Sequence, residues 1–288
     1  MQVSTAELPP DCLLAYRGDE KSRRWLLTTA GEPRWCVPGF GLGDALAVDG
    51  LAQLDGQPPG PHRDVELLAP VDDDTEVWAA GVTYEVSREA RMEESERAAD
   101  VYAAVYDAQR PELCFKSIGW RVRGSGETIG IRSDSTWDVP EPELAVVCAA
   151  TGDIVGATIC NDVSSRSIEG ENPLYLPQAK IFHGACAVGP WIRLVRSMGP
   201  LTQLDIAVAI RRGDTVVWSG GTCTARLHRR IEDLVDFLFR AERYPHGVVL
   251  STGTSAVPGP EVTLQPDDDI VIDIDSIGRL RNAVQSGL

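Results

Sequence analysis

Hydrophobic residues in the middle of the chain form two short, nearly uninterrupted runs, at residues 144–148 and 154–160. Such runs, bounded by turn residues, predict strands that are buried on both faces. The five residues between them include Gly152, and a short glycine-containing connection predicts a hairpin. We place the centre of this hairpin turn at Thr151-Gly152.

The same kind of pattern predicts the other main elements. Residues 76–80 alternate as in a strand, and residues 228–240 carry apolar side chains at helical spacing. A charged, alanine-rich helix is expected over residues 87–106, with Ser87 as its N-cap. From Pro111 onward the chain is rich in strand patterns and glycines. We therefore expect a mainly β, α+β fold with a small N-terminal domain at 1–70 and a catalytic domain at 71–288.

Composition excludes some partners. The net charge of −16 at pH 7 argues against nucleic acid and anionic membranes, because no counterion release would offset the repulsion. No signal-peptide layout and no apolar run of spanning length is present, so we expect a cytoplasmic protein. The seven cysteines are scattered without CxxC pairs, which favours reduced core thiols over a disulfide framework.

Three acidic residues flank the predicted hairpin. Glu141 and Glu143 lie two positions apart before the first apolar run, so they share one face of the strand. With the turn at Thr151-Gly152, Asp162 lies directly across from Glu141, whereas a register slip of one residue would turn it away. Three converging carboxylates favour a hard divalent cation such as Mg²⁺, with Mn²⁺ or Ca²⁺ as alternatives. The competing interpretation is a solvated strand edge bearing two glutamates between prolines.

Several motifs, taken together, resemble the fumarylacetoacetate hydrolase superfamily over roughly residues 76–288. They are Gly81-Val82-Thr83-Tyr84, Glu141-Pro142-Glu143-Leu144, Asn161-Asp162-Val163-Ser164-Ser165-Arg166, Gln178-Ala179-Lys180, Ser251-Thr252-Gly253-Thr254 and the final strand pair from Asp268 to Asn282. The resemblance implies a β-rich C-terminal core and a Mg²⁺ ion held by Glu141, Glu143 and Asp162. It also implies that Lys180 lies beside the ion, that Thr254 meets the substrate, and that the protein is a homo-oligomer.

One departure from the superfamily pattern bears on the reaction. Its hydrolases carry a basic histidine three residues after the position of Tyr84, and this chain has Ser87 there. Serine cannot activate water as a base near neutral pH, which disfavours C–C hydrolysis. Other segments, including Arg110-Pro111-Glu112-Leu113, Asp134-Ser135-Thr136-Trp137 and residues 168–180, resemble the superfamily's dehydratases of 2-keto-3-deoxy sugar acids.

These points lead to an expected function with named residues. We expect a metal-dependent lyase that converts a 2-keto-3-deoxypentonate to 2-oxoglutarate semialdehyde through a metal-stabilised enolate. The alternatives are an acylpyruvate or diketo-acid hydrolase or decarboxylase, and a non-catalytic metal- or metabolite-binding protein. Residues 168–177 are expected to form a loop over the site. The candidate residues are Lys180 and Glu112 for proton transfer, with a salt bridge and a surface position as their alternatives, and Arg88, Ser87, Lys116 and Thr254 for the substrate.

Overall fold

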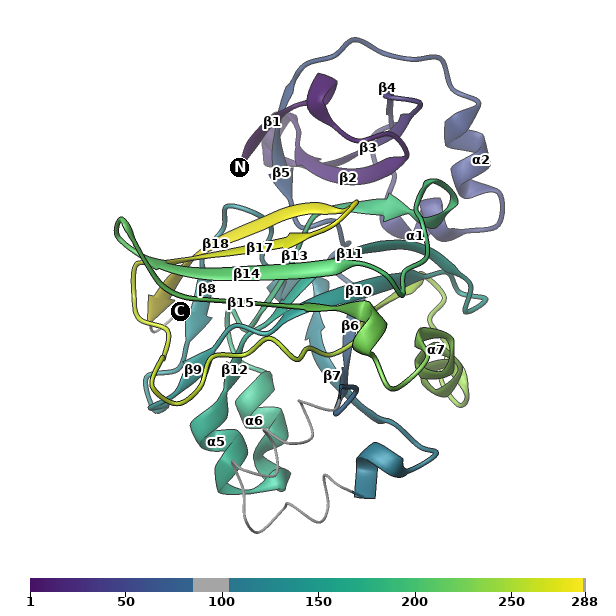
Figure 1. The fold of residues 1–288 in the computed structure, drawn as a ribbon. Coiled ribbons are helices and arrows are strands. Elements are labelled where there is room, and N and C mark those ends of the chain that lie inside the picture. Colours follow the sequence, from purple (N-terminus) through teal and green to yellow (C-terminus); the bar gives the residue numbers. More distant parts are fainter. Residues whose placement is uncertain (85–103, 287–288) are drawn as a thin grey trace.

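The computed structural model describes residues 1–84 and 104–286 and contains two large β-sheets that pack against each other (Figure 1). Across the larger sheet the strands are β1 (Gln2–Ser4), β5 (Asp64–Leu68), β2 (Cys12–Arg17), β13 (Cys186–Leu194), β11 (Ile154–Asp162), β10 (Pro142–Cys148), β16 (Val248–Ser251), β6 (Glu76–Gly81) and β7 (Glu112–Ile118), with β3 (Arg23–Thr29) beside β2 and β4 (Glu32–Trp35) beside β3. The smaller sheet consists of β15 (Thr215–Cys223), β14 (Asp205–Arg212), β17 (Asp268–Ile274), β18 (Gly278–Ser286) and β8 (Ile129–Ile131). β9 (Asp138–Val139) and β12 (Ser164–Ser165) form a separate pair.

Apart from helical residues 104–107, which adjoin the part of the chain that the structure does not describe, the described helices are short and lie at the margins of the sheets. They are α1 (Leu42–Leu46), α2 (Gly50–Asp55), α5 (Arg166–Glu171), α6 (Leu176–Lys180) and α7 (Ile231–Phe239), and the 3₁₀ turns are η1 (Thr5–Glu7), η2 (Asp19–Lys21), η3 (Gly119–Arg121), η4 (Pro173–Tyr175), η5 (Val195–Ser197) and η6 (Thr224–Arg226). The expected β-rich, α+β architecture is confirmed.

The two central strands are buried on both faces, as their apolar runs predict. Leu144 and Val146 of β10 pack into the core shared with the smaller sheet and α7. Ala145 and Val147 point to the opposite face, into a second core shared with strands of the N-terminal part. The side chains of β10 therefore alternate between the two hydrophobic cores. Glu143 lies on the same side of the strand as Ala145.

The hairpin between β10 and β11 has the predicted register but not the predicted turn. The Ala149 carbonyl accepts a hydrogen bond from Gly152 N at 2.9 Å, so the turn centres on Ala150-Thr151 rather than Thr151-Gly152. Gly152 follows with a φ of 88°, the left-handed conformation of a glycine bulge. A second irregularity between Val147 and Cys148 offsets the one-residue difference, and Pro142 pairs with Asn161. The prediction of the turn was wrong by one residue, yet Glu141 still faces Asp162.

The N-terminal strands are continuous with the rest of the larger sheet. β2 pairs antiparallel with β13, where Leu13 faces Ile192, and with β3 on its other side. The first residues of the chain therefore form one flank of a sheet whose centre is β10 and β11 (Figure 1). The division of the chain at residue 70 stays a prediction.

The helix predictions have mixed outcomes. The helix expected at 228–240 is confirmed as α7, whereas most of the helix expected at 87–106 lies outside the described residues. The loop expected at 168–177 is wrong, because this segment belongs to α5, η4 and α6. Ser165 and Asn172 cap backbone N–H groups of α5 and η4 with their side chains, and Pro173 and Pro177 stand in first turns, where proline is tolerated.

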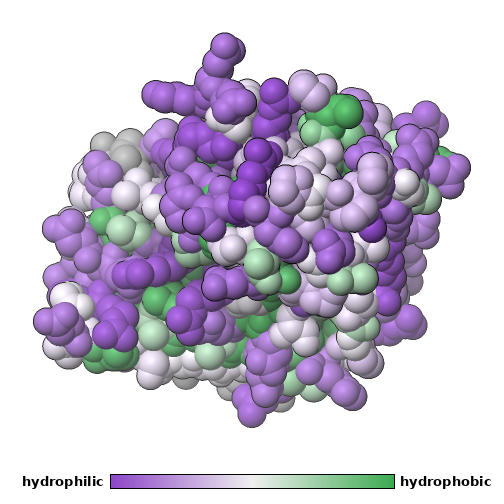
Figure 2. Space-filling model, turned by 90° about the horizontal axis from the view of Figure 1, so that it is seen from above, coloured by the Kyte–Doolittle hydropathy of each residue, from purple (hydrophilic) through white to green (hydrophobic). Residues whose placement is uncertain are grey.

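Within the described residues, no helix is long and apolar enough to cross a membrane. All seven cysteines are free thiols, as expected from their spacing. Hydrophilic residues cover most of the face that Figure 2 shows, with hydrophobic ones in smaller groups between them.

The hairpin gives a first testable prediction. Gly152→Ala should lower the free energy of unfolding by about 1 kcal/mol, because an L-residue is strained at this φ. Steric crowding adds little, since an added Cβ would meet the nearest atom, of Phe239, at 3.6 Å. Urea unfolding followed by circular dichroism measures the difference. Gly199→Ala is the matched control, because no atom lies within 4 Å of its added Cβ, and equal stability of the two variants would contradict the prediction.

Candidate metal centre and active site

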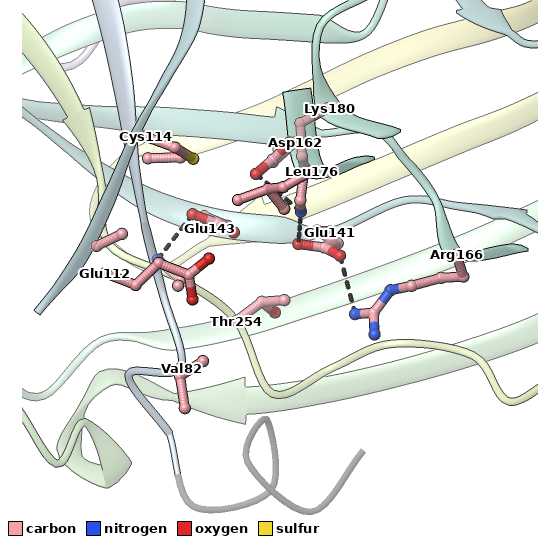
Figure 3. A pocket seen from close by; sticks show the side chains of 14 residues that line it. Val82, Glu112, Cys114, Glu141, Glu143, Asp162, Arg166, Leu176, Lys180 and Thr254 are labelled. Carbon is pink, nitrogen blue, oxygen red and sulfur yellow. Dashed lines mark hydrogen bonds and ion pairs between the residues drawn. The ribbon is translucent and has the colours of Figure 1, made fainter. Parts of the chain in front are cut away.

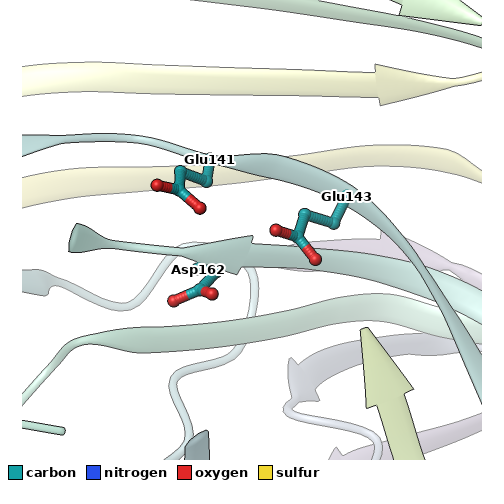
Figure 4. A group of neighbouring side chains, drawn as sticks. All are labelled: Glu141, Glu143 and Asp162. Atoms are coloured by element: carbon teal, nitrogen blue, oxygen red, sulfur yellow. The ribbon is translucent and has the colours of Figure 1, made fainter. Parts of the chain in front are cut away.

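Three buried carboxylates meet where β10 begins and β11 ends. Glu141 immediately precedes β10, Glu143 lies within it, and Asp162 is the last residue of β11. Asp162 N donates to the Glu141 carbonyl at 3.0 Å, which fixes the two residues opposite each other. Figure 4 shows the three side chains pointing toward one another, and their nearest oxygens all lie within 4.8 Å. Their exposed fractions are only 2–4%, so the solvated-edge interpretation does not describe them.

Two cations on the α5–α6 segment contact this cluster. The Lys180 ammonium, at the end of α6, lies 2.7 Å from Glu141 Oε2 and 3.2 Å from Asp162 Oδ2, and it donates to Ser164 Oγ at 2.6 Å. Arg166, the first residue of α5, donates from Nη2 to Glu141 Oε1 at 2.8 Å. The charge of the carboxylates is thus partly neutralised from the helical side of the site.

Glu143 is held from the other side by the last residue of β16 and by the loop that follows it. Its Oε2 accepts hydrogen bonds from Ser251 Oγ at 2.6 Å and from Gly253 N at 2.7 Å. Gly253 has a φ of 90°, and a Cβ there would come within 2.0 Å of Thr83 Oγ1. Burial, followed by the negative charges of Asp162 and Glu141, raises the pKa of Glu143 well above its usual value. The loop therefore orients one oxygen of a carboxylate whose charge requires a cation.

A pocket with an empty volume of about 400 Å³ opens over the three carboxylates (Figure 3). Glu112 of β7 lines it and pairs in register with Gly81. A Cβ on Gly81 would lie 2.4 Å from Glu112 Oε2, so the glycine leaves room for that carboxylate. Burial raises the pKa of the nearby Cys114 thiol to about 12, which keeps it neutral. The remaining wall includes Leu176 and Thr254.

The donor set fits a divalent cation. Mg²⁺ and related hard ions prefer oxygen ligands, and the described residues offer three carboxylates on one spot without competing thiolate or imidazole ligands. Glu141, Glu143 and Asp162 would hold the ion. Since three protein ligands leave positions of an octahedral ion free, about three could be filled by water and a bidentate ligand.

The structure brings together most of the residues predicted from the sequence. Lys180, Glu112 and Thr254 line the pocket with the metal-site carboxylates. Lys116 is not among the residues that line it; this buried residue forms an ion pair with Asp162 Oδ1 at 2.5 Å. Its contacts are with Asp162 and with two backbone carbonyls, and the expected substrate contact stays a prediction. Ser87 and Arg88 lie outside the described residues.

Sequence reasoning missed two features of the pocket. Arg166 follows Asp162 by four residues, within a motif that was noted but not assigned a role. The second feature is the pair of hydrogen bonds that Ser251 and Gly253 donate to Glu143. A signal existed for Gly253, since a glycine between two threonines at a strand end often marks a left-handed turn.

The comparisons with known proteins agree with this geometry. Residues 77–285 match the model of the fumarylacetoacetate (FAA) hydrolase C-terminal family. The chain belongs to this family. The match covers the second half of the larger sheet, the whole smaller sheet and every carboxylate of the cluster.

Two curated relatives are more informative about the subgroup. A probable 2-keto-3-deoxyxylonate dehydratase of Haloferax volcanii is 46% identical over 221 residues, 77% of this chain and 75% of that protein. A 2-dehydro-3-deoxy-D-arabinonate dehydratase of Saccharolobus solfataricus is 43% identical over 226 residues, 77% of this chain and 76% of that protein.

Solved structures extend the likeness to the N-terminal part. A 2-keto-3-deoxy-D-arabinonate dehydratase complexed with magnesium and 2,5-dioxopentanoate matches with a TM-score of 0.83 and 33% identity, over 96% of this chain and 99% of that one. A fumarylacetoacetate hydrolase from Exiguobacterium antarcticum matches with a TM-score of 0.71 at 21% identity, which shows a shared fold alone.

The metal site makes a prediction that does not depend on turnover. Mg²⁺ should raise the melting temperature of the protein by several degrees, because a ligand bound only to the folded state adds about 2.7 kcal/mol at 100 times its Kd. Glu143→Gln and Asp162→Asn should lose most of this increase in differential scanning fluorimetry. Asp236→Asn, an exposed carboxylate on α7, should keep it. An equal Mg²⁺ response in all four proteins would rule out the site.

Proposed function

We propose that this protein is a divalent-metal-dependent dehydratase that converts 2-keto-3-deoxypentonate to 2,5-dioxopentanoate, the semialdehyde of 2-oxoglutarate. The observation that carries the proposal is the cluster of Glu141, Glu143 and Asp162 beneath a pocket, in a chain 43–46% identical to pentonate dehydratases. A related structure containing magnesium and 2,5-dioxopentanoate supports both the ion and the product.

The overall reaction removes one water from the substrate. A hydrogen leaves C3 and the hydroxyl leaves C4, which gives an unsaturated 2-keto acid that still carries a hydroxyl on C5. In the second stage C5 loses one hydrogen and its hydroxyl oxygen loses another, while C3 and C4 each gain one. C5 thereby becomes the aldehyde carbon. A divalent ion bound by the three carboxylates would polarise the 2-keto group and make the C3 hydrogen acidic. The protein must therefore supply proton carriers on the C3–C4 side.

Two side chains in the pocket suit proton transfer. Lys180 Nζ lies within hydrogen-bond distance of Glu141, Asp162 and Ser164, so it reaches the metal-site carboxylates directly. Glu112 lines the same pocket on β7. We assign to these two residues the movement of protons between the substrate and solvent, and to Thr254 a contact with the substrate.

The other family activities serve as the alternative outcome. Hydrolysis of an acylpyruvate requires a base that activates water, and the chain has Ser87 where the hydrolases carry histidine. The homo-oligomeric state and the cytoplasmic location stay predictions, whereas the small-molecule 2-keto acid partner follows from the proposed reaction.

A direct assay tests the reaction class. Purified protein with Mg²⁺ should convert 2-keto-3-deoxypentonate to 2,5-dioxopentanoate, detected by NADP⁺ reduction through an added semialdehyde dehydrogenase. EDTA should abolish the signal, and Mg²⁺ or Mn²⁺ should restore it. Acylpyruvates should release little pyruvate. Efficient pyruvate release without semialdehyde formation would instead identify a hydrolase.

The role of Lys180 can be tested separately. Lys180→Met should lower kcat by about 100-fold or more, since positioned proton carriers contribute about 10²–10⁴-fold. The proportional loss of kcat should be larger than the loss of stability against unfolding, because methionine keeps most of the lysine side-chain volume. Lys21→Met, the same substitution at an exposed position, should leave kcat unchanged. Near wild-type turnover in Lys180→Met would leave Lys180 as a salt-bridge residue only.

A further inference from the structure

Lysine is rare in this chain, and its placement is not random. Of 27 basic residues, only Lys21, Lys116 and Lys180 are lysines. Lys21 is exposed, whereas Lys116 and Lys180 are both buried and both contact Asp162. A lysine ammonium directs three hydrogens tetrahedrally from one atom, which the planar guanidinium of arginine cannot do. Positions 116 and 180 are therefore sites at which one compact cation can contact several oxygen atoms from different directions.

Lys116 contacts three oxygen atoms of the protein. Its Nζ donates to the Val163 carbonyl at 2.9 Å and to the Lys180 carbonyl at 2.6 Å, and it lies 2.5 Å from Asp162 Oδ1. The residue is 1% exposed. The ammonium thus donates two hydrogen bonds and forms one ion pair, and all three oxygens belong to the metal-site segments β11 and α6 or to the residue between β11 and β12.

The strand that carries Lys116 is distorted at this residue. Between β6 and β7, Trp78 pairs with Phe115 and Val77 with Ser117, so Lys116 is the extra residue of a β-bulge. Bulges redirect side chains and are frequent beside active sites. Alternation places Lys116 on the same face as Glu112 and Cys114, which line the pocket, and the bulge lies at the residue whose side chain meets Asp162.

The two lysines divide the oxygens of Asp162 between them. Lys116 takes Oδ1, and Lys180 lies 3.2 Å from Oδ2. Since Lys116 also binds the Lys180 carbonyl, it connects the metal-site carboxylate to the main chain that carries the second lysine. Each oxygen of the Asp162 carboxylate therefore has its own charged partner.

We propose that Lys116 is a positioning residue for the metal centre: its ion pair with Oδ1 fixes the orientation of the Asp162 carboxylate, so that Asp162 can serve as a ligand of a divalent cation. It acts through Asp162 and Lys180 and does not touch the substrate. This inference rests on the proposed metal site, and it replaces the substrate contact expected for Lys116.

Metal affinity separates this role from simple charge neutralisation. If Lys116 only neutralised charge, its removal would strengthen cation binding, because one repelling charge would be gone. If it positions Asp162, its removal should weaken binding, and loss of such outer partners typically costs about 10–100-fold in metal affinity. The sign of the change in Kd therefore decides between the two roles.

The experiment measures Mn²⁺ binding by electron paramagnetic resonance in metal-free wild-type, Lys116→Met, Lys180→Met and Lys21→Met proteins. We expect Kd to rise by about 10-fold or more in Lys116→Met. Kd should stay equal or fall in Lys180→Met, which removes a cation from the Oδ2 side. Lys21→Met should match the wild type. Circular dichroism without metal confirms the fold, and if Lys116→Met does not fold, Lys116→Gln takes its place in the same measurement.

The possible results are distinct. Mn²⁺ binding to Lys116→Met that equals or exceeds wild-type binding would overturn the positioning role and leave the metal site standing. No Mn²⁺ binding to the wild type, or wild-type binding that survives Glu143→Gln, would instead overturn the metal site of the proposed function.

Discussion

Mutual repulsion among three buried carboxylates is the constraint on which the rest of this structure depends. Glu141, Glu143 and Asp162 are costly to bury together, since burial and then the charges of Asp162 and Glu141 raise the pKa of Glu143 and oppose folding. The chain surrounds them with cations and oriented donors from β7, α5, α6 and the loop after β16. Elements far apart in sequence are thereby brought to one point, where the clustered carboxylate oxygens would hold a divalent ion.

The strand pair that carries the carboxylates could be predicted because its pattern is local. Two apolar runs and one glycine are sufficient to define a hairpin, and the alternation of side chains then decides which acids share a face. The precise turn was not accessible in this way. The turn at Ala149–Gly152 shifts the strand register by one residue, and the irregularity at Val147 shifts it back by one. The final pairing shows only the combined result. The prediction of the site was therefore less sensitive to the turn than its reasoning implied.

Long-range partners were the part that sequence could not supply. Lys116 stands 46 residues before Asp162 in the numbering, and nothing local reveals that its ammonium meets that carboxylate. The helices that replace the expected loop at 168–177 depend on capping by Ser165 and Asn172, whose side chains could equally have favoured turns. Rarity was an unused signal: with so few lysines in the chain, two buried ones merited joint attention.

The pairing of β2 with β13 has a consequence for how this fold can vary. Without β2, the outer backbone groups of β13 near Ile192 and Arg193 would lie at an open sheet edge, which is a template for association with other chains. The family match begins at residue 77, so the segment that shields this edge lies before the shared part. Any protein that keeps the shared core but exchanges its leading segment must shield the same edge by other means. In this chain the leading segment therefore covers an edge that belongs to the shared core.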